Sequence, residues 1–384
     1  MTTEKLYEAD AYLRRFEATV LQCAPGKRGY VVVLDRSAFY PEGGGQPGDS
    51  GTLGGVAVTD THESDGVISH FCDGPLPVGA SVTGEIDWEA RFDRMQQHSG
   101  EHIVSGLICA AKGCNNVGFH MGAETVVIDF DAALTRDELD RIEAEANRVI
   151  WENRPFLVSY PSPEALAALD YRSKKALSGA VRIVECPGAD RCACCGTHVR
   201  AAGEIGLVRL LSVKPFRSGV RIEMLAGRRA YRWSCAMTAQ NSRVSALLSA
   251  RPGETAAAVE RLLKERDDAL YRLVGLENRL FAQQAEALAG QGDVLLFLEG
   301  MRPDALRRCF EAVSARCGGR CAVFAGDDAA GWKYALRLPE AAARSFVAGM
   351  NAALSGRGGG RDGFAQGSVA ATRAQIEAYF AGME

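Results

Sequence analysis

Two pairs of potential metal ligands, His98 with His102 and Cys194 with His198, are the residues of this chain best suited to chemistry. Within each pair the second residue follows four positions after the first. Residues with this spacing on a helix lie on one face, one turn apart, so two imidazoles there can share an ion. Three nitrogens and one thiolate around a tetrahedral centre suit zinc. The sequence therefore predicts a zinc site assembled from two distant segments.

The predicted donor set leaves the type of site and one ligand open. His98 and His102 do not form the His-Glu-x-x-His motif of zinc proteases, because Glu101 directly precedes the second histidine. Three histidines with one thiolate resemble an open or mixed site more than a closed four-cysteine structural site. Cys192 and Cys195 remain competing ligands, or buried small residues.

The bulk properties describe an ordinary globular protein of more than one domain. A chain of 384 residues exceeds what one hydrophobic core usually covers. Its net charge of -4 gives no global attraction for nucleic acid, so a polyanionic partner must be held by local basic patches. The N-terminus lacks an apolar signal core, and no run reaches the roughly 20 apolar residues of a membrane span. We therefore expect a cytoplasmic protein without a membrane partner, whose 12 cysteines are reduced.

The first half of the chain changes from a β-rich to a mixed pattern. Residues 1–90 contain short β-branched runs between Gly, Pro and Asp turns, interrupted by a loop at 39–49. From 91 to 235 a helix carries the histidine pair, and a second helix runs from Thr135 to Trp151, with Thr135 and Glu138 at capping-box spacing. Strands are predicted at 125–130, 181–184, 205–212 and 220–224.

The second half begins with a long helical segment at 236–291. Its stretch 254–289 has no proline, and Val259, Leu262, Arg266, Ala269, Leu273, Leu276 and Leu280 follow the alternating three-four spacing of a heptad seam. The seam fits equally a helix packed on its own chain and a dimerising coiled coil, since Arg266 weakens it. Residues 292–384 predict an α/β domain, with strands at 294–298 and 322–324, a helix at 303–315, and a Gly-rich loop at 356–366 before a last helix.

Two Gly-rich segments and several arginines are candidates for ligand contact. Glycines at 43–45, followed by Gln46, let backbone N–H groups approach a ligand closely, although an ordinary hairpin turn has the same composition. Arg357 and Arg361 in the second glycine segment favour contact with a phosphate or RNA backbone. Further basic clusters are Arg217 with Arg221, Lys174-Lys175 and Arg228-Arg229, each individually no more specific than a solvated face.

Taken in order, these motifs strongly resemble the editing domain of alanyl-tRNA synthetase and its freestanding AlaX relatives. The matching segments are Phe39–Pro47, Met95–His102, Val117–Gly122, Cys194–Val199, Gly203–Gly206 and Arg217–Glu223. The glycine-rich segment before Phe364-Ala365-Gln366 resembles the C-terminal domain of that synthetase, which is related to the DHH-associated phosphoesterase domain. No segment resembles the aminoacylation core, so the resemblance is to a long-form, freestanding editing protein.

The resemblance implies an α+β multidomain fold. Its expected parts are an N-terminal β-barrel at 1–90, a zinc-binding editing domain at 91–235, a helical linker or coiled coil at 236–291, and a C-terminal α/β tRNA-binding domain at 292–384. The coiled-coil interpretation adds a homodimer through the helix 254–289 as the alternative to a packed helix.

The resemblance also implies an activity, the hydrolysis of the ester in tRNA(Ala) mischarged with serine or glycine. The expected zinc ligands are His98, His102, Cys194 and His198. The expected substrate-lining residues are Gly43, Gly44, Gly45, Gln46, Asn116 and His120, and the expected tRNA contacts are Arg217, Arg221, Arg357 and Arg361. The different-class alternative is a zinc-stabilised tRNA-binding or regulatory module without hydrolytic activity.

Two positions depart from the family pattern. The family commonly has Cys-Gly-Gly-Thr-His, whereas here Cys195 replaces the first glycine. Asn116 stands where the family often carries a hydroxyl residue that lines the amino-acid pocket. An asparagine still hydrogen-bonds a serine hydroxyl, so discrimination against alanine is compatible with this change.

Overall fold

The computed structural model describes residues 2–27, 29–173 and 180–382, so the predicted basic cluster Lys174-Lys175 lies outside the described residues. The chain divides into two compact units, residues 1–242 and 243–384. Within the described ranges, no helix combines the length and the apolar character that crossing a bilayer requires.

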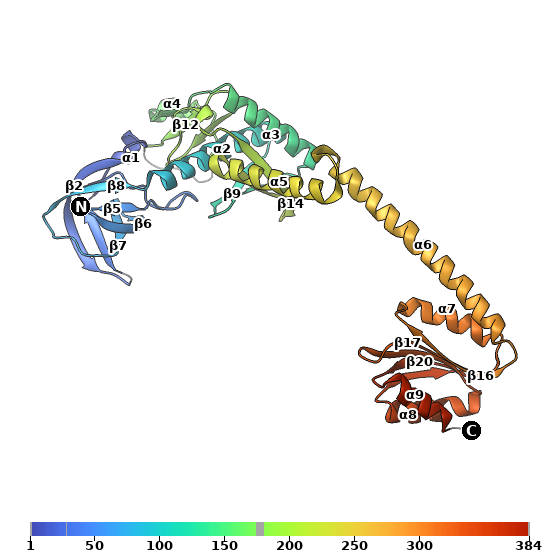
Figure 1. Cartoon of the computed structure of the whole chain (residues 1–384). Coiled ribbons are helices and arrows are strands. Elements are labelled where there is room, and N and C mark those ends of the chain that lie inside the picture. The colour runs from blue at the N-terminus through green and yellow to red at the C-terminus, as the bar shows by residue number, and fades with distance from the viewer. Residues whose placement is uncertain (1, 28, 174–179, 383–384) are drawn as a thin grey trace. The chain divides into compact units, whose positions relative to one another are not determined.

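The first unit begins with a closed barrel of six strands in the order β2-β3-β7-β6-β5-β8 (Figure 1). The strands are β2 (Arg15–Pro25), β3 (Tyr30–Leu34), β5 (Gly51–Leu53), β6 (Val56–Ser64), β7 (Val67–Cys72) and β8 (Ser81–Ile86). Alternate side chains such as Phe16, Val20 and Leu53 are buried inside it, as the two-residue period of a strand requires. Two short strands outside the barrel, β1 (Glu4–Lys5) and β4 (Arg36–Ser37), pair in parallel, and helix α1 (Leu6–Ala9) follows β1. The predicted barrel is confirmed.

The second part of this unit is built on an antiparallel sheet with the order β14-β15-β10-β9. Its strands are β9 (Asn116–Met121), β10 (Val126–Phe130), β14 (Val208–Phe216) and β15 (Gly219–Ala226). Helices α2 (Trp88–Lys112) and α3 (Arg136–Trp151) bury Ile103, Leu139 and Ile150 in one apolar core with strand residues such as Ile128 and Ile222. The predicted strand at 205–212 begins later than expected, because Ile205 ends the 3₁₀ turn η1 (Ala202–Glu204).

Local sequence signals fix the ends of both helices. The Asp87 side chain accepts a hydrogen bond from the Ala90 N–H at the start of α2, and Gly113 ends it with φ +62°. At the start of α3 the predicted capping box of Thr135 and Glu138 is present. Helix α2 therefore carries both histidines of the first predicted ligand pair.

A small antiparallel sheet, β11-β12-β13, leads into the second ligand segment. Its strands are β11 (Leu157–Ser159), β12 (Ile183–Cys186) and β13 (Asp190–Ala193), and helix α4 (Pro163–Ala167) follows β11. Because β13 ends at Ala193, the Cys194–His198 loop starts directly at the end of a paired strand.

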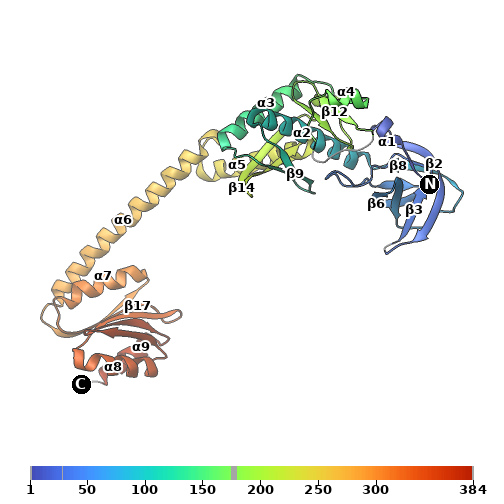
Figure 2. The ribbon, with the colours of Figure 1, turned by 180° about the vertical axis from the view of Figure 1, so that it is seen from behind.

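The second unit is an α/β sandwich on a five-stranded sheet with the order β16-β17-β18-β20-β19. Helix α7 covers one face, and α8 and α9 cover the other (Figures 1 and 2). Its elements are β16 (Gly292–Glu299), α7 (Pro303–Ser314), β17 (Gly318–Asp327), β18 (Gly331–Arg337), α8 (Glu340–Ala353), β19 (Arg357–Arg361), β20 (Phe364–Val369) and α9 (Arg373–Ala381). Helix α5 (Gly227–Leu248) crosses the boundary between the units, and η2 (Pro252–Glu254) and α6 (Thr255–Ala287) follow it.

The Gly-rich segment 356–366 was predicted as a loop, and this prediction is wrong. Residues 357–361 form the edge strand β19, which pairs with β20. The glycines serve close packing, because a Cβ at Gly358 would lie 2.4 Å from the Tyr334 hydroxyl oxygen and one at Gly367 would lie 2.5 Å from it. Glycine therefore marks a crowded strand here, where composition alone indicated a turn.

Candidate metal centre

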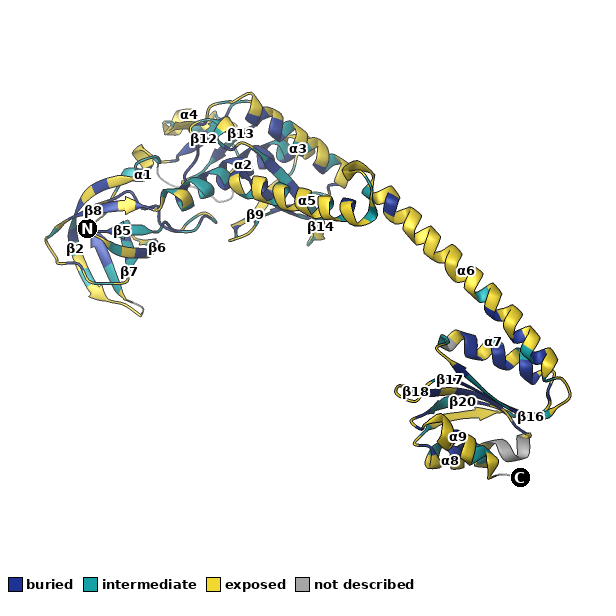
Figure 3. Ribbon diagram, in the orientation of Figure 1, coloured by how far each residue is buried: buried dark blue, intermediate teal, exposed yellow. Residues whose placement is uncertain are grey.

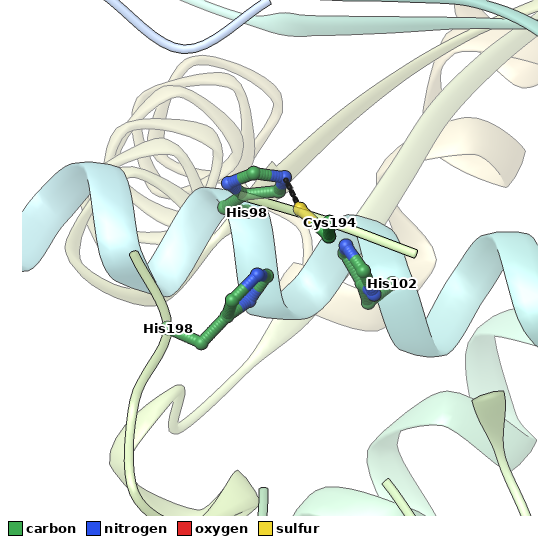
Figure 4. A group of neighbouring side chains, drawn as sticks. All are labelled: His98, His102, Cys194 and His198. Atoms are coloured by element: carbon green, nitrogen blue, oxygen red, sulfur yellow. Dashed lines mark hydrogen bonds between the residues drawn. The ribbon is translucent and has the colours of Figure 1, made fainter. Parts of the chain in front are cut away.

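Four predicted ligands converge in the first unit. His98 and His102 extend from α2 toward Cys194 and His198, which lie on the loop after β13 (Figure 4). One donor atom from each of the four lies within 4.8 Å of the others. The Cys194 Sγ is 3.5 Å from the His98 Nε2. The three imidazoles are all buried, so the group is a compact, water-poor cluster of good zinc donors.

Each imidazole has its own polar partner at Nδ1. His98 Nδ1 is 2.9 Å from the Gln46 Oε1, and His198 Nδ1 is 3.4 Å from the Ser99 Oγ. His102 Nδ1 is 2.9 Å from an Asp190 carboxylate oxygen, an ion-pair distance whose geometry is not that of a hydrogen bond. With Nδ1 occupied, Nε2 is the nitrogen left to bind an ion, which is the arrangement that orients histidine ligands in metalloproteins. The His198 Nε2 is buried and has no hydrogen-bond partner among the described residues. This unpartnered atom is what a zinc site with these ligands requires.

The charges within the cluster also fit zinc. Burial raises the pKa of the Cys194 thiol, but the neighbouring His98 and His102 outweigh burial and hold that pKa well below its usual value. Burial and the same two histidines lower the pKa of His198. Burial lowers the pKa of His102, but Cys194 and Asp190 reverse this and raise it well above its ordinary value. The Cys194 thiolate and the neutral His198 are in the protonation state that a metal binds, whereas the raised pKa of His102 means that an ion would have to displace a proton from this ring.

The Cys194–His198 loop is held by contacts that only this local sequence permits. The Arg182 guanidinium donates to the carbonyl oxygens of Cys194 at 2.8 Å and Gly196 at 3.0 Å. A Cβ on Gly196 would lie 2.1 Å from His98 Cε1, so the loop approaches α2 too closely for any other residue. Cys195, the departure from the family pattern, is exposed. Gly196, which lies against His98, is therefore retained from the family pattern, whereas the position of the replaced glycine, Cys195, is exposed.

The alternative ligand Cys192 is buried in a second, overlapping group. One donor atom each of His102, Asp190 and Cys192 lies within 4.8 Å of the others. Burial raises the pKa of the Cys192 thiol, and the nearby His102 lowers it less than burial raises it. Among the described residues, the group that gathers all three imidazoles contains Cys194 and not Cys192, so Cys194 is the cysteine that fits the centre.

The glycine loop at 43–46 is pinned against both the ligand helix and β9. Gly43 and Gln46 exchange backbone hydrogen bonds of 3.1 and 3.0 Å, and the Gly45 carbonyl accepts from the Met121 N–H. Gly44 and Gly45 have φ +60° and +87°, which favour glycine. The Gln46 side chain is fully buried, where it contacts His98 and donates to the Thr197 hydroxyl at 2.9 Å.

The two predicted substrate-lining residues of β9 have different surroundings. Asn116 is buried, and its amide nitrogen donates to Glu101 at 2.7 Å and Ser105 at 2.8 Å. His120 is exposed, whereas its neighbour Phe119 stacks on the His98 ring with centroids 5.2 Å apart. Of the two β9 side chains Phe119 and His120, the one against the ligand cluster is thus Phe119.

A cavity of about 780 Å³ lies beside the ligand helix. Asn116, Asp190 and Arg172 are among its lining residues. The Arg172 guanidinium binds both Asp190 oxygens, at 2.6 and 2.9 Å, and so fixes the carboxylate that contacts His102. Asp190 therefore both lines the cavity and contacts the predicted ligand His102.

The four predicted tRNA-contacting arginines are not gathered in one unit. Arg221 pairs with Asp129 through contacts of 2.7 and 2.8 Å and stacks on Phe216, while Arg217 sits in the exposed turn between β14 and β15. Arg357 and Arg361 are exposed on the edge strand β19. Each pair lies on a surface of its own unit.

Asp190, Ser99 and Arg182, which contact the predicted ligands or their loop, have no motif of their own, so they are recognisable only from the fold. One signal for Asp190 is a possible charge partner, Arg172, which bridges to Cys192, two residues after Asp190. That signal alone is weak, because charged pairs are common on surfaces.

Comparison with known proteins agrees with this architecture. Residues 5–90, which fold as the barrel, match a family model described as tRNA synthetases class II (A). Residues 181–223, which carry Cys194 and His198, match the threonyl and alanyl tRNA synthetase second additional domain. The fold and site thus define the class of protein that shares accessory domains with these synthetases.

The relatives narrow this class. The chain is 31% identical to the alanyl-tRNA editing protein AlaX-L of Pyrococcus horikoshii, over 76% of this chain and 73% of that protein. It is 30% identical to the alanyl-tRNA editing protein Aarsd1 of Mus musculus, over 67% of each. An alanine–tRNA ligase of Ignicoccus hospitalis is 32% identical over 82% of this chain, which spans only 36% of that ligase. The chain belongs to the alanyl-tRNA editing protein family.

Proposed function

We propose that this protein hydrolyses the ester bond of tRNA(Ala) that carries a wrong amino acid, with serine as the preferred error and glycine as a second one. The observation that carries the proposal is the convergence of His98, His102, Cys194 and His198, with a buried His198 Nε2 that lacks a hydrogen-bond partner among the described residues. A relative named AlaX-L covers most of the chain and supports the same activity.

The physical need for such an enzyme follows from the size of the amino acids. A synthetase pocket for alanine cannot strongly reject a substrate that merely adds a hydroxyl or lacks a methyl, so a separate site must hydrolyse the errors. A site that hydrogen-bonds the serine hydroxyl spares alanine, because alanine would leave a buried polar group unpaired.

In our proposal zinc is held by the four convergent residues, and when bound it supplies a positive charge that anchors the amino acid or polarises the ester. Gln46, Asp190 and Ser99 orient the three imidazoles from outside. The backbone of Gly43–Gln46 lines the ester and the tRNA end. Arg217, Arg357 and Arg361, which are exposed, and Arg221, which is half-buried and paired with Asp129, contact the tRNA backbone.

Asn116 is the residue proposed to discriminate serine from alanine. Both of its amide hydrogens are used by Glu101 and Ser105, while Oδ1 accepts, from the residues that the structure describes, only the Gly118 N–H, at 3.2 Å. An amide oxygen has two acceptor positions, so one remains for a serine hydroxyl. Asn116 also borders the 780 Å³ cavity, which has room for an amino acid.

The test compares hydrolysis of seryl-tRNA(Ala), glycyl-tRNA(Ala) and correctly charged alanyl-tRNA(Ala) by the full chain, with zinc measured in the same preparation. We expect release of serine, sparing of alanine and about one zinc per chain. His98→Ala should remove both zinc and hydrolysis, whereas Cys309→Ala, a matched change in the second unit, should preserve both. Zinc with no hydrolysis above the spontaneous rate would overturn the enzyme and leave a tRNA-binding or regulatory module.

A further inference from the structure

Helix α6 of the second unit has two faces with different surroundings. Near its C-terminal end α7 packs against it, where Phe281 is buried and Glu277 pairs with Arg308. The heptad seam lies beside this contact and is exposed (Figure 3). The exposed fractions of its apolar side chains are 39% for Val259, 52% for Leu262, 40% for Leu273, 57% for Leu276 and 41% for Leu280.

Such a helix needs a partner. Most of the stability of a helix in a protein comes from packing of its apolar face, and an isolated helix is marginal in water. A row of partly exposed leucines along several turns also exceeds the scattered apolar residues of an ordinary surface. From Val259 to Leu280, α6 therefore carries an apolar stripe that its own unit leaves open.

We propose that the stripe is covered by α6 of a second copy of this chain, in an antiparallel pair centred between Asp267 and Asp268. In this register Val259 faces Leu276 of the second copy and Leu262 faces its Leu273. Arg266 faces Ala269 of the second copy, so the one long polar residue of the seam lies against its smallest one. The pairing also places Leu263 beside Leu270 of the second copy at one edge of the seam.

The charges at the other edge favour the same register. Glu265 faces Arg272 of the second copy. Because the dimer is two-fold symmetric, it contains this attraction twice. A parallel, in-register pair would instead stack Arg266 on itself and leave a gap between two alanines at 269. In that pair Arg272 would face Glu277, which is already buried against Arg308. The antiparallel arrangement is the one in which each layer of the seam is complementary.

The first experiment measures the mass of the full chain in solution over a range of concentrations. We expect a dimer, and we expect Leu273→Lys to give a monomer of unchanged helix content by circular dichroism. Lys264→Glu and Asp268→Arg, on the opposite side of α6, should remain dimeric and serve as controls. A monomer of the unaltered chain at all concentrations would overturn the proposal.

The second experiment tests the register by charge reversal. Glu265→Arg alone and Arg272→Glu alone should each weaken the dimer about tenfold, since each replaces two attractions by two repulsions. The double variant E265R/R272E should restore the original dissociation constant, because the facing charges are exchanged together. A double variant that stays as weak as its parents would contradict the antiparallel register. Neither result depends on hydrolytic activity, so a failure here is distinguishable from a failure of the proposed function.

Discussion

The cysteines of the two units have opposite surroundings: Cys194 in the first unit is half-buried, whereas Cys309 and Cys321 in the second unit are buried. In the first unit Cys194 lies among three imidazoles, which hold its pKa well below the usual value despite burial. In the second unit Cys309 and Cys321 lie in the apolar core between α7 and the sheet, where burial raises their pKa to about 11 and about 12. Neighbouring imidazoles therefore lower the pKa of one thiol, and an apolar core raises the pKa of the others.

The largest expected difference is between removing a ligand thiol and removing a core thiol. Cys194→Ala should sharply lower the zinc retained per chain after dialysis, because it removes the thiolate and leaves three imidazole donors. Cys309→Ala should retain about one zinc per chain and lose only modest stability from a small cavity. Zinc per chain, measured by atomic emission on both purified variants, checks this. Equal zinc content in the two variants would contradict the assignment of Cys194 as a ligand.

A smaller loss is expected when an orienting residue is changed. Asp190→Asn weakens the contact to His102 and should lower zinc affinity by roughly 10- to 100-fold. The matched control is Asp49→Asn, which breaks another buried pair, with Arg91, in the same unit but away from the ligand atoms. Both variants should lose stability, and only the first should lose affinity in a competition titration with a chelator. Equal zinc affinity in the two would mean that Asp190 is structural.

The two adjacent positions of the ligand loop should differ in the same assay. Gly196→Ala introduces a Cβ 2.1 Å from His98 Cε1 and should weaken zinc binding about tenfold through a displaced ligand. Cys195→Gly restores the common family residue at an exposed position and should leave the affinity unchanged. Weaker binding by the Cys195 variant would show that the extra thiol is a ligand.

The smallest effect concerns the second unit at alkaline pH. The folded pKa of Cys321 is raised from 9.0 to about 12, so the folded state holds this proton more tightly than the unfolded state. Stability is therefore unaffected below pH 9 and falls between pH 9 and about 12, by ~1.4 kcal/mol per pH unit for this thiol. Denaturant unfolding at pH 8 and pH 10 should show a smaller drop for Cys321→Ala than for the parent chain. Cys235→Ala, at an exposed position, should behave like the parent chain. An identical drop in the free energy of unfolding of all three proteins would contradict the raised pKa of Cys321.

Much of the fold followed from local sequence. The capping box at Thr135 defines α3, and the proline-free stretch after 254 became α6. The glycine segment at 356–366 was misread, because the packing of Gly358 on Tyr334 depends on a strand that is distant in sequence. Local propensity reports turns, whereas close approach between distant strands is a tertiary property.

The site shows the same limit. The spacing of His98 with His102 indicated shared ligation, and the structure brings both to Cys194 and His198. The orienting contacts of Asp190, Ser99 and Gln46 could not be predicted, because each depends on the packing of α2 against a loop or strand from elsewhere in the chain. The sequence identifies the residue types that can bind a metal, whereas the orientation of their side chains depends on the fold.

X-ray absorption at the zinc edge of the purified full chain counts the donor atoms around the ion and so identifies the ligands. The convergence of His98, His102, Cys194 and His198 predicts three nitrogens at about 2.0–2.1 Å and one sulfur at about 2.3 Å. A shell with two or more sulfurs would place Cys192 or Cys195 on the metal and contradict the assigned ligands, and a chain that binds no zinc would contradict the centre itself.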